Sequence, residues 1–85
     1  RELEKAVNRA YDNCMERLHD IYPSIKDYEL KACLLIKADV PLKNIAVNLG
    51  MEQNALSMLR ARLYKKMFQA KKGSATMLDD FIKSL

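Results

Sequence analysis

The residues best suited to chemistry in this 85-residue chain are basic side chains, gathered in one stretch that lacks acidic residues. Residues 53–78 contain no Asp or Glu and six basic residues, which are Arg60, Arg62, Lys65, Lys66, Lys71 and Lys72. Because the whole chain has a formal net charge of +4, the residues outside this stretch carry −2 together. Such a localised positive field favours an anionic partner, above all nucleic acid and, less well, a membrane surface.

Side chains that enzymes use for catalysis form no constellation in the sequence. Cys14 and Cys33 are the only cysteines, His19 is the only histidine, and no Cys-x-x-Cys pair occurs. A zinc site needs about four ligands, so we expect no metal and no cofactor. We interpret the cysteines as small core residues in a reducing compartment, with a disulfide or a reactive thiol as the alternative. A nucleophile beside a base and a glycine-rich phosphate loop are also missing, so we expect a binding protein and not an enzyme.

Hydrophobic spacing predicts an all-α fold, a small helical bundle that begins with a long amphipathic helix. This first helix spans about residues 1–22 and ends before Pro23, because a proline disfavours the helical conformation of the residue before it. It is interpreted either as the end of a coiled coil or as a helix packed on the domain. The second helix, predicted over residues 27–38, has almost no polar face in its middle. We therefore expect the first helix to cover Leu34 or Leu35.

The remaining helices are separated by a tight turn and a polar break. The third is predicted over residues 42–49, between a proline and a glycine that favour a helix start and a helix end. The fourth is predicted over about residues 53–70. The fifth is predicted to begin near Thr76, with Asp79 completing a capping box.

The third and fourth helices match the requirements of a helix-turn-helix. Ala46, Gly50 and Leu56 supply the small residue at the crossing, the glycine in the turn and the aliphatic residue that packs back. Residues 25–67 resemble the LuxR-type helix-turn-helix, with "IKDYE", "LKACLLIKAD" and "PLKNIA" in place of the family's successive motifs. A variant of this family that is common in regulators of Bacteroidetes is similar in the segments "LIKA", "SM-R-R" and "KK" and in a terminal helix like "LDDFI". The resemblance implies a DNA-binding module of a transcriptional regulator, with the fourth helix as recognition helix.

At about 100° per residue, one face of the fourth helix lies opposite the inward Leu56. The residues expected to contact DNA base edges are on or beside this face, and they are Asn54, Ser57, Met58 and Ala61. The residues expected to contact phosphates are Arg62, Lys65 and Lys66, to which the resemblance adds Lys43. Arg60 is expected to bond Glu29 instead, and Lys71 and Lys72 are interpreted as solvated.

Three departures from the family pattern support an alternative interpretation. Glu52 replaces the Ser or Thr that begins the recognition helix, which places a negative charge near the phosphates, and Ala55 and Ala61 replace longer polar residues. The alternative is a degenerate helix-turn-helix that serves as a protein-interaction or dimerisation module. If the domain binds DNA, we expect double-stranded DNA as partner and a homodimer, because one such helix reads few base pairs.

The sequence predicts two parts, a connector over residues 1–22 and a helix-turn-helix domain over residues 25–85. The chain starts within a helical pattern and without an initiator methionine, so we expect it to be a fragment of a longer protein. No apolar run approaches the roughly 20 residues of a membrane span, and no signal-peptide pattern is present. We therefore expect a cytoplasmic location and no membrane contact from this fragment.

Overall fold

Every regular element in residues 13–85, the part of the chain that the computed structural model describes, is an α-helix. Residues 13–21 are helical, and the helix stops before Pro23 as predicted. Four helices follow, namely α2 (Asp27–Lys37), α3 (Leu42–Leu49), α4 (Gln53–Phe68) and α5 (Ala75–Lys83). The predicted all-α class is therefore confirmed. The predicted helix over residues 1–12 lies outside the described residues.

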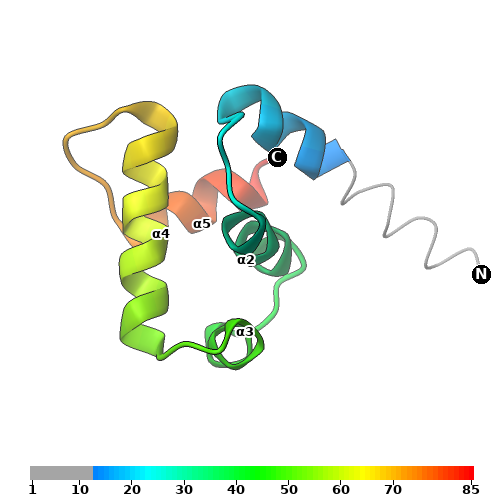
Figure 1. Cartoon of the computed structure of the whole chain (residues 1–85), viewed down its shortest axis with the longest axis vertical. Helices are drawn as coiled ribbons and strands as arrows, with labels where there is room; N and C mark the ends of the chain where they lie inside the picture. Colours follow the sequence, from blue (N-terminus) through cyan, green and yellow to red (C-terminus); the bar gives the residue numbers. More distant parts are fainter. Residues whose placement is uncertain (1–12) are drawn as a thin grey trace, which may run out of the picture.

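Helix α4, the longest of the four, stands upright at one side of the described fold in Figure 1. Helix α3 lies near the N-terminal end of α4, and the two are joined by the turn at Gly50. Helix α5 passes behind and contacts both α4 and α2. The described part of the first helix lies at the other end of the molecule from α3 (Figure 1). This arrangement leaves one long side of α4 uncovered by the other labelled helices.

All five helical segments contribute to one hydrophobic core. The side chains that are almost fully buried are Cys14, Leu18, Ala32, Cys33, Ile36, Ile45, Ala46, Leu56, Leu63, Met67, Leu78 and Ile82. Leu34 and Leu35, the residues expected to need a covering helix, are half-buried against this core. Because Cys14 and Leu18 come from the first helix, its described part packs on the domain.

The turn between α3 and α4 follows from its glycine. Gly50 has φ +66° and ψ 36°, a left-handed conformation that glycine adopts at little cost, and its N–H donates to carbonyl groups of the last turn of α3. Pro41 precedes the first residue of α3, so its missing N–H interrupts no hydrogen bond of the helix. The observed bounds of α3 are those predicted.

One predicted helix end and one predicted helix cap differ from the structure. Helix α4 ends at Phe68 and not near Ala70, because Gln69 takes a left-handed conformation with φ 50°. Helix α5 begins at Ala75, capped by the Ser74 hydroxyl, which accepts a hydrogen bond from the Met77 N–H at 3.2 Å. The predicted capping box from Thr76 to Asp79 therefore does not form.

Contacts at both ends of α5 add to its packing in the core. The Lys37 ammonium at the end of α2 donates hydrogen bonds to the carbonyl oxygens of Lys83, at 3.1 Å, and of Leu85. A charge-assisted bond of this kind satisfies carbonyl groups that the end of a helix leaves without partners. The loop before α5 also approaches α4 closely, since a Cβ atom at Gly73 would lie 2.7 Å from Cδ1 of Tyr64.

Candidate nucleic-acid interface

The outer face of α4 brings most of the predicted base-contacting residues to the surface. Asn54, Ser57 and Met58 are exposed, with Met58 53% exposed. Ala61 is less accessible, because it is half-buried and its carbonyl oxygen lies 3.5 Å from where a Cβ atom of Gly73 would be. Three of the four side chains are thus freely accessible on one helix, whereas Ala61 lies beside the loop between α4 and α5.

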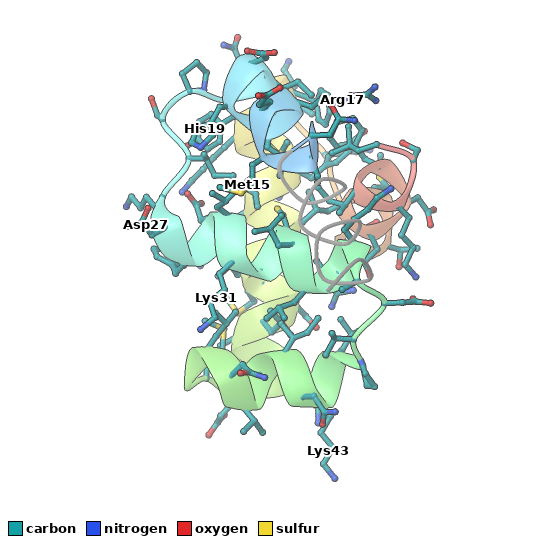
Figure 2. All side chains as sticks on the ribbon, turned by 90° about the vertical axis from the view of Figure 1, so that its right-hand side faces the viewer. Met15, Arg17, His19, Asp27, Lys31 and Lys43 are labelled. Carbon is teal, nitrogen blue, oxygen red and sulfur yellow. The ribbon has the colours of Figure 1, made fainter. Side chains whose placement is uncertain are left out.

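A shallow hollow of about 390 Å³ lies where α3 meets the start of α4. Its lining includes Lys43 from α3, Glu52 from the turn and Asn54 from α4. Figure 2 shows the Lys43 side chain extending from α3 away from the rest of the molecule. The structure therefore brings one predicted phosphate contact and one predicted base contact to the same depression, with a carboxylate between the elements that carry them.

Glu52 occupies the position directly before α4 without acting as a side-chain cap. Its backbone is extended, with φ −78° and ψ 159°, and its carboxylate accepts no hydrogen bond from the first turn of the helix. The Glu52 carboxylate therefore does not satisfy any of the free N–H groups at the start of α4. The negative charge of Glu52 remains at the surface, at the end of α4 that carries Asn54.

The predicted phosphate-contacting residues differ in their surroundings. Lys43, Arg62 and Lys65 are exposed, and within residues 13–85 none of them forms an ion pair. Lys66 is also exposed, but its Nζ lies 3.8 Å from Oε2 of Glu29. An intramolecular carboxylate therefore offsets part of the positive charge of Lys66.

Glu29 is a buried carboxylate, 2% exposed, and its two oxygens face different groups. Oε1 accepts a hydrogen bond from the Lys26 N–H at 2.9 Å, which satisfies a donor at the start of α2. Oε2 faces Lys66 of α4. Glu29 thus connects α2 with α4, although not through the residue that the sequence suggested.

The predicted pair between Arg60 and Glu29 is wrong, because Arg60 pairs with Asp79 of α5. Nε of Arg60 donates to Oδ1 of Asp79 at 3.0 Å, and Nη2 donates to Oδ2. The two side chains are only 6% and 19% exposed. Such a bidentate geometry is specific in orientation, so the pair holds α4 against α5.

A row of aromatic side chains lies between α4 and α5, and this surface feature was not predicted from the sequence. The ring centroids of Tyr64 and Phe68 are 4.9 Å apart, as are those of Phe68 and Phe81. Phe68 and Met77 are 42% and 44% exposed. The four-residue spacing of Tyr64 and Phe68, and of Met77 and Phe81, places each pair on one helix face and was the available signal.

Both cysteines are buried and unbonded to each other. Burial raises the pKa of the Cys33 thiol to about 12, and the nearby Cys14, Glu29 and Asp79 add to the effect. Burial also raises the pKa of the Cys14 thiol, against the opposing charges of Lys37 and Arg17. A raised pKa disfavours the reactive thiolate, so both residues behave as apolar core groups.

Residues 13–85 contain no group of three or more His, Cys, Asp or Glu side chains arranged to hold a metal ion. In the same range, no helix combines the length and the apolar character needed to cross a bilayer. The exposed face of α4, together with Lys43, is therefore the feature that most needs a functional explanation. Comparisons of the chain with protein-family models, with curated proteins and with solved structures find no match.

Proposed function

We propose that this chain is the DNA-binding module of a transcriptional regulator and that α4 lies in the major groove of double-stranded DNA. The observation that carries the proposal is the composition of the exposed face of α4. Its N-terminal half presents Asn54, Ser57 and Met58, whose amide, hydroxyl and apolar groups suit base edges. Its next turns present Arg62 and Lys65, whose charges suit phosphates.

The opposite face of α4 supports this role because it fixes the orientation of the helix. Leu56 and Leu63 are 1% and 0% exposed in the core, and Arg60 pairs with Asp79. Base readout requires side chains held to within a fraction of an ångström by their supports. A helix that is anchored over its length by core packing and by an ion pair satisfies this requirement.

The position of Lys43 extends the proposed interface beyond α4. In a helix-turn-helix, the first helix of the motif crosses the DNA backbone while the second enters the groove. Lys43 near the start of α3 and Asn54 near the start of α4 line the same hollow. A phosphate bound by Lys43 would therefore lie next to the end of α4 that reads bases, with Glu52 as an unfavourable neighbour.

The test is a titration of fluorescently labelled random duplex DNA, followed by anisotropy at several salt concentrations. Lys65→Gln should weaken binding to all sequences about equally and lower the salt slope by about one unit, because one phosphate contact is lost. Lys66→Gln should have a smaller effect, because Lys66 is paired with Glu29. The matched control is Lys31→Gln, which replaces an exposed lysine of α2 and should leave the salt slope unchanged. Figure 2 shows α4 behind α2, so Lys31 lies away from the proposed interface. Equal slopes for Lys65→Gln and the wild type would contradict the proposal.

Two further variants separate base readout from charge. Asn54→Ala should change the preferred sequence, by about 1–3 kcal/mol at one base pair, in a selection from a randomised duplex pool. Glu52→Ser should tighten binding to every sequence, because it removes a negative charge beside the phosphates. A Glu52→Ser variant that binds more weakly than the wild type would contradict the assigned position of the DNA.

A second candidate function is a protein-interaction module, for which the exposed apolar side chains of the motif are the specific support. Val47, Met58 and Leu42 are 74%, 53% and 38% exposed. Undetectable DNA binding at about 50 mM salt, by both the wild type and the Glu52→Ser variant, would favour this function. Sedimentation analysis of the same samples would test the proposed homodimer.

A further inference from the structure

We infer that a patch between α4 and α5 docks an acidic protein segment that carries an apolar anchor side chain. The patch, here called the aromatic patch, consists of Tyr64, Phe68, Met77 and Phe81, and the lysines beside it are Lys65, Lys71 and Lys72. The inference goes beyond the proposed DNA binding and does not depend on it.

The apolar part of the surface is continuous across two helices. Phe68 contacts Tyr64 on α4 and Phe81 on α5, each at a centroid distance of 4.9 Å. Met77 lies one helical turn before Phe81, on the same face of α5. Phe68 and Met77 remain 42% and 44% exposed, so part of each side chain is available to a partner. Methionine suits such a surface, because its flexible side chain adapts to the shape of the group that it contacts.

The loop between α4 and α5 brings positive charge to this patch. A Cβ atom at Gly73 would lie 2.7 Å from Cδ1 of Tyr64 and 3.2 Å from Cγ of Lys65. The segment that carries Lys71 and Lys72 therefore folds back against the end of α4, and all three lysines are exposed. None of the three forms an ion pair within residues 13–85.

Acidic side chains near the patch offset little of this charge. Residues 53–78 contain no Asp or Glu, and Asp79 is paired with Arg60. Asp80 is exposed and, at about 100° per residue, lies about 60° around α5 from Met77, so this single carboxylate borders the patch and opposes three lysines. The patch therefore combines apolar contact area with a positive rim, which complements an apolar side chain flanked by carboxylates.

The geometry favours a protein segment over single-stranded nucleic acid. Successive bases stack on accessible aromatic faces, but these rings are inclined to one another, at 49° for Tyr64 and Phe68 and at 90° for Phe68 and Phe81. A second copy of the chain, docked through the same patch, would bring its own lysines against these. Like charges facing each other across an interface are unfavourable.

The patch is also accessible when the start of α4 is occupied. Asn54 and Phe68 are both on α4, and at about 1.5 Å per residue they are about 20 Å apart along the axis. This separation exceeds the length of any side chain. A partner on the aromatic patch therefore leaves Asn54 and the N-terminal half of α4 free, whereas Lys65 borders both surfaces.

The test uses the chain and a short fluorescein-labelled peptide rich in Asp, Leu and Phe, with binding followed by anisotropy at low salt. The peptide should bind saturably to the wild type. The variant Lys71→Glu with Lys72→Glu should bind it about tenfold more weakly or worse, because two attractive charges become repulsive. The matched control is Lys26→Glu, directly before α2, combined with Lys31→Glu on α2. It makes the same charge change away from the patch and should alter the affinity less than about twofold.

Apolar contact is tested with Phe68→Ser and Met77→Ser, with circular dichroism confirming that each variant is folded. Met77 lies outside the aromatic stack, so Met77→Ser is the safer variant and should weaken binding about threefold or more. A peptide in which Ser replaces Leu and Phe should bind much more weakly than the original. Amide chemical shifts that change around Phe68 and Phe81, and not around Leu42 or Val47, would locate the peptide as inferred.

Four binding results would overturn the inference. They are absence of saturable peptide binding, unchanged affinity of the Lys71 and Lys72 variant, equal binding of the Ser-substituted peptide, and tighter Phe68-dependent binding of labelled oligothymidylate than of the acidic peptide. The last result would assign the patch to single-stranded nucleic acid. A change in sedimentation of the unliganded chain on Lys71→Glu with Lys72→Glu would assign it to a second copy and would equally overturn the inference.

Discussion

Replacing Asp79 by Ala should destabilise the domain strongly, because it leaves the guanidinium of Arg60 buried without a partner. The Arg60 side chain is 6% exposed and the Asp79 side chain 19%. Removing one member of a buried ion pair costs about 3–5 kcal/mol, and the partial exposure of Asp79 places the expected loss near 3 kcal/mol. Since about 1 kcal/mol corresponds to roughly 4–8 °C in a domain of this size, Tm should fall by about 12–24 °C.

The difference in exposure also predicts which partner matters more. In Arg60→Met, the carboxylate of Asp79 can be hydrated, so the loss of stability should be about 1 kcal/mol. The double variant, with Arg60→Met and Asp79→Ala, should be more stable than Asp79→Ala alone, because it contains no unpaired buried charge.

The assay is urea unfolding followed by circular dichroism, completed as a double-mutant cycle. The order of stability should be wild type, Arg60→Met, double variant and Asp79→Ala. A loss below about 1 kcal/mol for Asp79→Ala would show that the guanidinium is hydrated in solution. A larger loss for Arg60→Met than for Asp79→Ala would refute the reasoning from exposure.

Substitutions at three other positions test the core and the turns. Relative to Cys33→Ala, the wild type should lose about 1.4 kcal/mol of unfolding free energy per pH unit above pH 9. The reason is that the Cys33 thiol ionises near pH 9.0 in the unfolded chain but stays protonated until about pH 12 in the folded chain. Ionisation therefore favours the unfolded chain between these values: the contribution of Cys33 to stability is complete below pH 9 and is lost as the pH rises to 12. If urea titrations gave a difference in unfolding free energy between the wild type and Cys33→Ala that does not change with pH, this prediction would be contradicted. Gly73→Ala should cost about 1–2 kcal/mol in thermal melts because of its contact with Tyr64, and an unchanged Tm would mean that the loop moves away. Gly50→Ala should cost about 1 kcal/mol from its positive φ alone, and Gly50→Asn should cost less.

The elements that could be predicted from the sequence are those with local stop and start signals. The bounds of α3 matched because a proline and a glycine mark its ends, and both act through the backbone alone. The end of α4 was missed because Gln69 takes a left-handed conformation, and no residue type with that preference marks the position. The start of α5 could be predicted to within one residue, but its cap could not, because Ser74 and Thr76 are both good caps and only the structure shows which hydroxyl meets a free N–H.

Partners of charged side chains depend on how helices cross, which helical periodicity does not contain. Periodicity placed Arg60 at the edge of the inward face, where both Glu29 and Asp79 were available carboxylates. The crossing of α5 behind α4 presents Asp79 in a bidentate geometry, whereas Glu29 faces Lys26 and Lys66. The exposure of Asn54, Ser57 and Met58 could be predicted, because it follows from which face of α4 carries the buried leucines. Lys66 is the predicted contact whose local partner could not be foreseen.

The position of α5 has a consequence for how the domain forms during synthesis. Helix α5 is the last in the sequence, yet Leu78 and Ile82 are both 0% exposed in the core, and Asp79 supplies the partner of Arg60. A nascent chain that ends at Phe68 would contain both helices of the motif but would expose Leu63 and Met67 and leave Arg60 unpaired. The contacts between α4 and α5 form only after α5 has been synthesised, because both helices contribute to them. We therefore expect α4 to become firmly oriented only after residues 75–83 have left the ribosome, so that a prematurely terminated chain would be recognised by proteases and would not occupy a binding site.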